Sequence, residues 1–466
     1  MTNFKNWRKL VLLLVLVSGL LFFSSWRGSQ MWTREKRVFV PLEPCFSHCP
    51  KKGRPLKISV ISNGQTRNDY SFNSSVDLGI KVFSEKFKQF VTDNQEWRNF
   101  SGEIDFRWLL MVNDVSFTSI IESYLSAAFW KADFMIAIGF FHEEVLKAIP
   151  NYHFLNSSKV RFIFIDGKVE GIPGLESAYF ASELAGVKAG VASALHALKN
   201  FPGRTAKFST FGAFNSLAIT RYMTGFYWGE EWVRRLLEGG RSKDIDWIRS
   251  WLQQPSLPGK QVGDFENKKL RFLTLSNQFT NGLNIGGAVS ISDKLLDYGV
   301  NYILPVAGVQ GFDTLREVKK FGSNAWVIGV DTNFAILFPD YNDLIIFSAV
   351  KRCDLAVLYS LWDGFKISAK EEKQEKYGNK NSSNKFFTLG RSFLYTTEEK
   401  GIINGLVSGN VWNFNRFFDD LFSDPRIISL QQNALSFVQL HPTDLWQKKD
   451  DFWNFSKEKE ISKTRW

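Results

Sequence analysis

From Leu56 onward, short apolar runs alternate with helical patterns, and this alternation leaves few folds open to the chain. The runs are rich in β-branched and aromatic residues, which is typical of strands buried on both faces of a parallel sheet. The predicted strands are Leu56–Ser62, Ile104–Val112, Asp133–Gly139, Val160–Asp166, Ala206–Gly212, Leu270–Leu275, Val300–Val306, Ala325–Val330 and Leu344–Val350. The predicted helices are Val76–Val91, Phe117–Lys131, Glu143–Ile149, Glu183–Lys199, Ser216–Leu237, Gly286–Tyr298 and Phe312–Phe321. We therefore expect an α/β protein built from βαβ units.

The alternation runs through the chain twice, and the small-residue helix Glu183–Lys199 opens the second series. A chain of 466 residues is too long for one compact core. The two series predict two lobes, each a mainly parallel sheet flanked by helices. We place lobe 1 at 56–176 with a return segment at about 332–410, lobe 2 at 177–331, and a C-terminal extension of helical segments at 411–466. The polar stretches Glu238–Lys269 and Lys366–Lys385 are predicted to be a surface insertion and a solvated loop.

The N-terminus carries a basic segment followed by an apolar run, Leu10–Trp26. Such a segment is a signal anchor or a signal peptide. We assign residues 1–26 to it, and residues 27–55, which are basic and contain several prolines, to a tether. The interpretation we favour is an uncleaved anchor, with the bulk of the chain on the extracytoplasmic face of the cell membrane.

The chain is basic, with a net charge of +11 and a pI of about 9.3. An excess of this size favours anionic surfaces such as lipid headgroups, nucleic acid or acidic ligands. No dense cluster of Lys and Arg accompanies it, and no zinc-finger or RRM-like signature is present. We therefore expect no nucleic-acid partner.

Signatures of enzymes are scarce in the sequence. It lacks the G-x-S-x-G elbow, the G-x-x-x-x-G-K-[ST] phosphate loop and the H-E-x-x-H metal motif. A hydrolase would need clustered carboxylates that hold a metal or activate water, whereas the acids here are dispersed. We expect no catalysis and no cofactor or metal.

Polar side chains instead gather where the predicted strands end. Asp69, Phe72 and Asn73 follow the first strand, and Asp166 ends the fourth. In α/β sheets, ligands bind at the carboxyl ends of the strands. A second interpretation of the first loop is a helix start, with Asn73 or Ser74 as an N-cap. The two interpretations are compatible, because Phe72 can face a cleft while its neighbour caps the helix.

Several pieces of sequence, in order, resemble the basic membrane protein (BMP) family of ABC-transporter substrate-binding lipoproteins, which includes purine nucleoside receptors of spirochaetes. The pieces are Asn68–Gly79, Ala132–Phe141, Val160–Gly167, Phe180–Leu195, Met223–Gly229, Val300–Leu315, Trp326–Asp331 and Phe347–Arg352. They cover roughly Leu56–Gly364. The resemblance implies a two-lobed, type I periplasmic-binding-protein-like fold that closes on a nucleoside.

The resemblance also implies roles for particular residues. Phe72 would stack on the base, with Asp69 and Asn73 contacting polar groups of the ligand. Asp331 and Lys351 would lie at the ribose. The remaining site residues would be Phe140 and Glu143, after the third strand, and the glycines Gly308 and Gly311.

We therefore predict a membrane-anchored, extracytoplasmic binding protein that captures a nucleoside and delivers it to an ABC permease. One alternative keeps the fold but changes the ligand to a sugar-like molecule. Another is a surface interaction or adhesion protein on the same fold. For such a protein the basic charge and the C-terminal extension would matter most, and mutations in the cleft would have no effect.

Overall fold

The computed structural model describes residues 55–62, 64–93, 101–109, 115–151, 160–170, 172, 175–239, 246, 268–322, 324–362, 364, 391–395, 406–408, 422 and 424–463. These residues lie in one compact unit, Cys45–Trp466. The predicted anchor, nearly all of the tether, most of Glu238–Lys269 and the loop Lys366–Lys385 lie outside the described residues.

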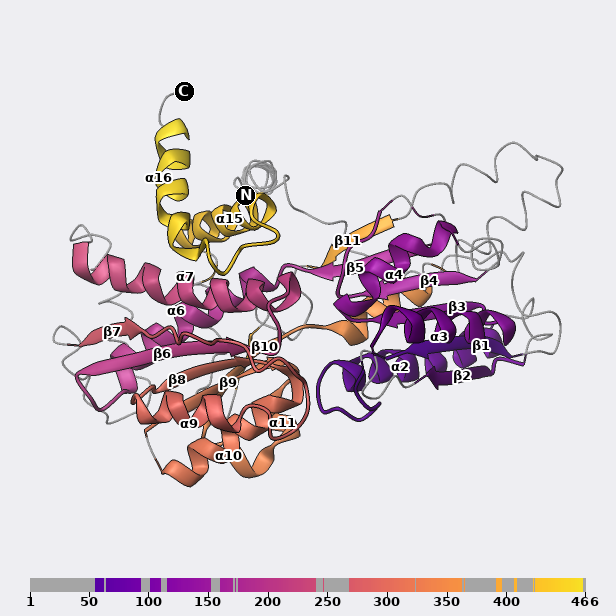
Figure 1. The fold of residues 1–466 in the computed structure, drawn as a ribbon, viewed down its shortest axis with the longest axis horizontal. Helices are drawn as coiled ribbons and strands as arrows, with labels where there is room; N and C mark the ends of the chain where they lie inside the picture. The colour runs from indigo at the N-terminus through magenta and orange to yellow at the C-terminus, as the bar shows by residue number, and fades with distance from the viewer. Residues whose placement is uncertain are drawn as a thin grey trace, which may run out of the picture. The chain divides into compact units, whose positions relative to one another are not determined.

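Among the described residues, six strands form a first sheet in the order β11-β5-β4-β3-β1-β2 (Figure 1). Every neighbouring pair in this sheet is parallel. The strands are β1 (Leu56–Ile61), β2 (Ile104–Leu109), β3 (Phe134–Ile138), β4 (Arg161–Ile165), β5 (Leu175–Phe180) and β11 (Arg391–Tyr395).

The second sheet has the order β12-β10-β9-β8-β6-β7 within the described ranges. Its pairs are parallel except β10 with β12, which is antiparallel. The strands are β6 (Thr205–Gly212), β7 (Lys269–Phe272), β8 (Tyr302–Val306), β9 (Trp326–Asp331), β10 (Ile345–Val350) and β12 (Leu406–Ser408).

The two sheets repeat one topology. In chain order, the first five strands of each sheet are arranged 2-1-3-4-5, and a strand from late in the chain is added beside the fifth. This doubly wound order has its topological switch point between the first and third strands, where ligands of open α/β sheets bind. The structure is thus α/β with two lobes of the type I periplasmic-binding-protein kind.

Helices cover both faces of the first sheet because successive strand residues point to opposite sides. In β3, Phe134, Ile136 and Ile138 pack with α2 (Phe72–Asp93) and a helix at 353–362. Met135 and Ala137, from the same strand, pack with the opposite layer. That layer consists of α3 (Phe117–Phe129), the 3-10 turns η2 (Phe140–His142) and η3 (Ile149–Asn151), and α4 (Glu143–Ala148).

One face of the second sheet carries α6 (Ser182–Asn200) and α7 (Leu217–Gly239). A Cβ on Gly190 would clash with the backbone oxygen of Phe226, and one on Gly229 with that of Val187. The small residues of α6 therefore let the two helix backbones touch. The other face, seen below the sheet in Figure 1, carries α9 (Val289–Asp297), η5 (Gly308–Gln310), α10 (Gly311–Phe321), α11 (Phe334–Leu337) and η6 (Pro339–Tyr341).

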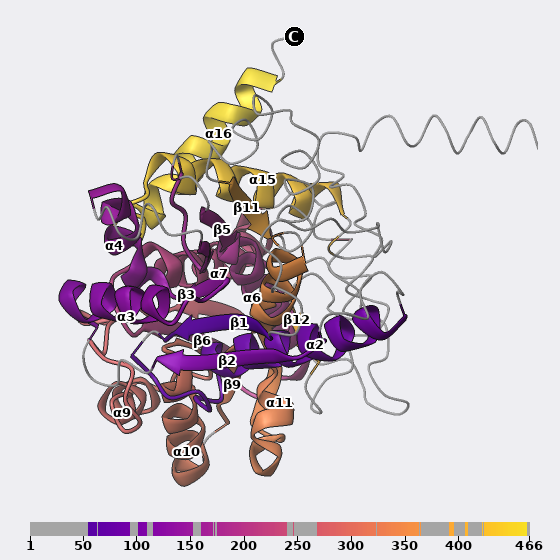
Figure 2. The same ribbon diagram turned by 90° about the vertical axis from the view of Figure 1, so that its right-hand side faces the viewer.

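The C-terminal helices α15 (Pro425–Leu440) and α16 (Phe452–Lys463), yellow in Figures 1 and 2, pack on α6 and α7. They are linked through the 3-10 turn η7 (Lys449–Asp451). Asp424 caps the start of α15 by accepting from the backbone N–H of Arg426 at 2.8 Å. The prediction of helical segments packed on a lobe is confirmed.

All of the strands and helices predicted from the sequence are present, with differences at their ends. Strands β5, β11 and β12 were not predicted. The return segment predicted at about 332–410 contains β10, of the second sheet, and the 353–362 helix, of the first lobe. Among the helices of the described ranges, none combines the length and apolar character that a membrane span requires.

Candidate functional site

The carboxyl ends of strands from both sheets meet at a cavity of about 60 Å³. Its walls come from the segments after β1, β3 and β4 in the first lobe and after β6, β7, β8, β9 and β10 in the second. The switch points of both sheets therefore face one space. The lining residues are Gln65, Ser71, Phe72, Gly139, Phe140, Phe141, Asp166, Ala213, Ala218, Ile219, Tyr222, Leu283, Val306, Ala307, Gly308, Asp331 and Lys351.

A buried ion cluster joins the lobes in this cavity. The ammonium of Lys351, after β10, donates to both carboxylate oxygens of Asp166, after β4, at 2.9 and 3.0 Å. It also lies 3.6 Å from Oδ1 of Asp331, at the end of β9. Because β4 and β9 are the fourth strands of their sheets, the two carboxylates occupy equivalent places in the two lobes.

Both aspartates have left-handed backbones, with φ of 72° at Asp166 and 66° at Asp331. This conformation is uncommon for residues other than glycine, although Asp and Asn tolerate it best. Strained backbone of this kind tends to occur at binding sites, where it aims a side chain. Here it turns each carboxylate towards Lys351.

Burial would by itself lower the pKa of Lys351, but the negative charges of Asp166 and Asp331 outweigh it and raise that pKa above its ordinary value. Lys351 therefore remains a cation although its side chain is only 3% exposed. Three rings surround the ammonium, with centroids 5.4 Å away for Phe72, 5.7 Å for Phe180 and 5.3 Å for Tyr222. At these distances a ring face attracts a cation.

The residues of the loop after β1 have two different roles. Phe72 lines the cavity. Asp69 is turned away from it and caps α2, accepting from the backbone N–H groups of Ser71, Asn73 and Ser74 at 2.9 to 3.0 Å. The amide of Asn73 donates to the backbone oxygens of Gln65 and Thr66.

Asp69 and Asn73 are thus outside the cavity wall, and any contact of theirs with a ligand remains a prediction. The helix start is capped by Asp69 rather than by the predicted Asn73 or Ser74. Burial raises the pKa of Asp69, and the three backbone hydrogen bonds oppose this rise.

The other predicted residues also separate into two groups. Phe140 and Gly308 line the cavity, and Gly308 has a φ of 56°, which favours glycine. Gly311 instead begins α10, where a Cβ would lie 2.6 Å from the ring of Phe334. Glu143 pairs with Lys147 at 2.8 Å and lines a neighbouring hollow.

The sequence indicated Asp166 only as a polar strand end, and it gave no indication of Gln65 or Tyr222. Gln65 joins the lobes, since its Nε2 donates to the backbone oxygen of Leu283 at 2.8 Å. Tyr222 lies within α7, where an aromatic residue in a helical pattern predicts only core packing. The glutamine could have been suspected from its position in the loop after the first strand.

The cavity offers flat rings, carboxylate acceptors and one cation. Carboxylates accept hydrogen bonds from hydroxyl groups, and rings stack on planar heterocycles. Within the described ranges, no group of three His, Cys, Asp or Glu side chains could hold a metal ion. The arrangement suits reversible binding of a polar small molecule.

Curated relatives of the chain are lipoproteins by name. The uncharacterized lipoprotein MG040 of Mycoplasma genitalium is 25% identical over 371 residues, covering 65% of this chain and 61% of the relative. Its Mycoplasma pneumoniae homologue is 26% identical over 294 residues, covering 48% of this chain and 44% of the relative. The chain thus spans less than two thirds of the length of each.

Solved structures of similar fold include ABC-transporter solute-binding proteins. One from Aeropyrum pernix K1 has a TM-score of 0.49 and 16% identity, covering 87% of this chain and 90% of the other. Another, from Agrobacterium vitis and bound with α-D-tagatopyranose, has a TM-score of 0.43 and 11% identity, covering 80% and 98%. The fold assignment itself rests on the two sheets and their strand order.

The family whose model matches residues 56–231 is described as ABC transporter substrate-binding protein, PnrA-like. The matched range includes the whole loop after β1, the end of β4 with Asp166, helix α6, and α7 as far as Glu231. It is a family of substrate-binding proteins rather than of enzymes. Residues 56–231 of the chain thus match the model of the Bmp family of PnrA-like ABC-transporter substrate-binding proteins.

Proposed function

We propose that the chain is the extracytoplasmic, membrane-anchored binding component of an ABC transporter and that its ligand is a purine nucleoside. The observation that carries the proposal is the cluster of Lys351 with Asp166 and Asp331 beside the ring of Phe72. It lies in a cavity walled by both lobes.

The chemistry of a nucleoside matches these groups. Its base is a flat heterocycle that can stack on Phe72, the role that the family resemblance implies for this residue. Its ribose hydroxyls can donate to the carboxylates of Asp166 and Asp331. Lys351 would then hold both carboxylates in place and donate to a ribose oxygen.

Binding requires the lobes to separate first. The cavity of about 60 Å³ is far smaller than the roughly 300 Å³ or more of ordinary ligand pockets. The described chain passes between the lobes near Phe180–Ser182 and again between Val350 and Cys353. We propose that these crossings act as the hinge, with the lobes closing over the ligand.

Two observations support the membrane side of the proposal. The sequence carries the apolar run Leu10–Trp26 behind basic residues. The curated relatives in Mycoplasma genitalium and Mycoplasma pneumoniae are lipoproteins by name. A tethered binding protein hands its ligand to a permease in the same membrane, so an ABC permease is the partner that we propose.

Isothermal titration of the full chain in detergent with inosine, guanosine, adenosine and uridine tests the ligand. We expect binding of the purine nucleosides and loss of that binding in Asp331→Ala. Tagatose and galactose serve as the sugar arm. Heat release with a sugar alone, or an affinity unchanged in Asp331→Ala, contradicts the nucleoside proposal.

A further inference from the structure

A larger hollow of about 480 Å³ adjoins the cavity. Phe140, Asp166 and Ala218 belong to the walls of both spaces, so the two spaces are adjacent. We call the larger space the vestibule. Its other lining residues include Glu143, Lys168, Arg221, Val438, Gln439 and Pro442.

The vestibule has three walls. The first lobe supplies the loops after β3 and β4, and the second lobe supplies the start of α7. The third wall is the end of α15, with Val438 and Gln439, and Pro442 just beyond it. The C-terminal extension thus borders a space next to the ligand cavity although it lies outside both sheets.

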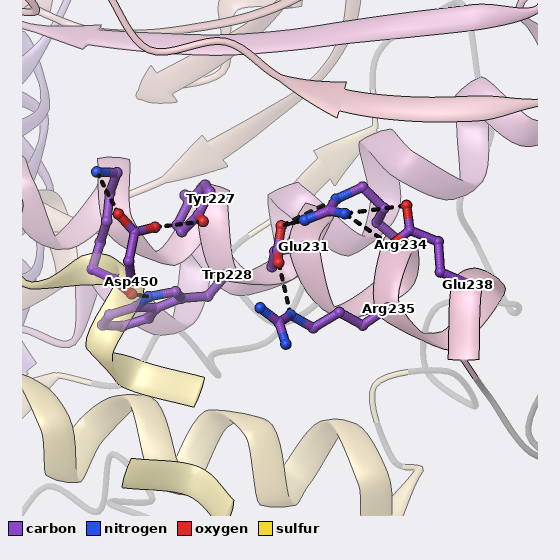
Figure 3. Close-up of polar contacts among 8 residues, drawn as sticks. Tyr227, Trp228, Glu231, Arg234, Arg235, Glu238 and Asp450 are labelled. Carbon is purple, nitrogen blue, oxygen red and sulfur yellow. Dashed lines mark hydrogen bonds and ion pairs between the residues drawn. The ribbon is translucent and has the colours of Figure 1, made fainter. Parts of the chain in front are cut away.

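The extension is firmly attached to the second lobe. Tyr227 donates to Oδ1 of Asp450 at 2.6 Å, and the indole N–H of Trp228 donates to the backbone oxygen of Lys449 at 2.8 Å (Figure 3). The ring of Trp228 also stacks on Phe452, with centroids 4.3 Å apart.

Within α7, Glu231 holds the next turn of the helix by accepting from both Arg234 and Arg235 (Figure 3). Buried residues of α15, among them Leu430 and Phe437, complete the contact with α6 and α7. The third wall is therefore attached to the second lobe and would move together with it.

We propose that the end of α15 is a wall of the route by which ligand reaches the cavity and that Gln439 limits passage along it. The inference rests on the proposed function. The vestibule has the volume of an ordinary ligand pocket, whereas the cavity does not. Gln439, whose side chain is exposed, lines the same vestibule as Asp166, so a ligand that approaches Asp166 through this space passes the wall that carries Gln439.

The chain offers a matched pair of glutamines to test this role. Gln432 and Gln439 are both exposed and both lie on α15. They are seven residues apart, or about 10 Å along the helix. Only Gln439 lines the vestibule. Substitution by tryptophan at each position adds the same bulk on the same helix.

The rates of binding of a purine nucleoside are measured by surface plasmon resonance on the full chain in detergent. In Gln439→Trp we expect both rate constants to fall by the same factor, at least about threefold, because an obstacle on the route raises the barrier equally in both directions. The dissociation constant stays unchanged. In Gln432→Trp neither rate constant changes. Equal rates in the two variants overturn the inference while the nucleoside proposal stands.

A second experiment measures the accessibility of an introduced thiol and needs no nucleoside. Ala218→Cys places a thiol in the wall shared by the two spaces, and a charged methanethiosulfonate reagent reports its accessibility by mass spectrometry of that peptide. We expect Gln439→Trp to slow this reaction and Gln432→Trp to leave it unchanged. No effect of Gln439→Trp contradicts the inference, even if the parent chain binds no nucleoside.

Discussion

Lys351 of the second lobe bonds Asp166 of the first, with Nζ 2.9 Å from Oδ1. The residues are 185 positions apart in the sequence. One cation therefore ties together the two halves of the site. A ligand that takes over part of this contact changes the balance between open and closed lobes, which couples recognition to closure.

Replacing Lys351 by methionine is expected to impair both folding and binding. The change keeps the length of the side chain but leaves Asp166 and Asp331 without their cation. Breaking a buried ion pair from one side costs about 3–5 kcal/mol. Chemical denaturation measures the stability loss, and titration calorimetry the loss of nucleoside affinity. Lys168→Met removes a half-exposed lysine and serves as the control, for which we expect little change in either quantity.

Asp331→Asn is expected to weaken nucleoside binding while the fold is kept. Oδ1 of Asp331 is buried without a hydrogen-bond partner, so this oxygen is available to a ligand hydroxyl. Loss of a hydrogen bond to a charged group costs about 1.5–3 kcal/mol, or roughly tenfold to a hundredfold in affinity. The exposed Asp340→Asn is the control. If the two variants bind the nucleoside with equal affinity, Asp331 does not contact the ligand.

Phe72 and Phe83 provide a test of base stacking within one helix. Both are buried in α2 and belong to the same apolar cluster, but only Phe72 lines the cavity. Leucine at either position should reduce stability by about 1–2 kcal/mol, because a buried ring is lost. Calorimetry should show a loss of nucleoside affinity in Phe72→Leu alone. The stacking role fails if Phe83→Leu weakens binding as much.

Protonation of His142 is expected to lower the free energy of unfolding as the pH falls from about 6.5 to about 4. His142 is fully buried, accepts from the hydroxyl of Tyr124 at 2.8 Å, and bonds the backbone oxygen of Ser62. Burial lowers its pKa to about 4. In this pH range the unfolded chain binds a proton at this residue and the folded chain does not, so acid favours unfolding.

This histidine contributes up to about 3 kcal/mol to that loss. Urea denaturation between pH 7 and pH 4 measures it. His142→Gln should flatten the profile. A profile unaltered in His142→Gln would contradict the assignment.

The contact of α6 with α7 predicts opposite effects of alanine at two glycines. Gly190→Ala would push a methyl group into the backbone of Phe226 and should cost more than about 2 kcal/mol through overpacking. At Gly239, the last residue of α7, nothing lies within 4 Å of the new methyl group. Gly239→Ala should be neutral or stabilise by up to about 1 kcal/mol. Thermal denaturation of the two variants compares these effects.

Much of the fold could be predicted because each buried strand is a nearly continuous apolar run. Strand β5, LESAYF, escaped prediction because the polar residues Glu176 and Ser177 interrupt its apolar pattern. Strands β11 and β12 come from segments with no such pattern, and pairing with a distant neighbour defines them.

The site was less predictable than the fold. Strand ends and the family resemblance pointed to Phe72, Asp331 and Lys351, all of which line the cavity. Asp69 has the same residue type and lies in the same loop as Phe72, yet it caps a helix. A carboxylate in such a loop can either cap the helix or face the cavity, and the residue type alone does not decide between the two.

The repeated strand order gives the cavity an approximate twofold arrangement of carboxylates, in which Asp166 and Asp331 occupy equivalent positions. The residue after the fifth strand does not follow this twofold arrangement, because the second lobe has Lys351 where the first has Ala181. The cavity thus has one cationic side between two like carboxylates. A ligand whose two ends differ in charge or in hydrogen-bonding groups would therefore bind this cavity in one orientation rather than the other.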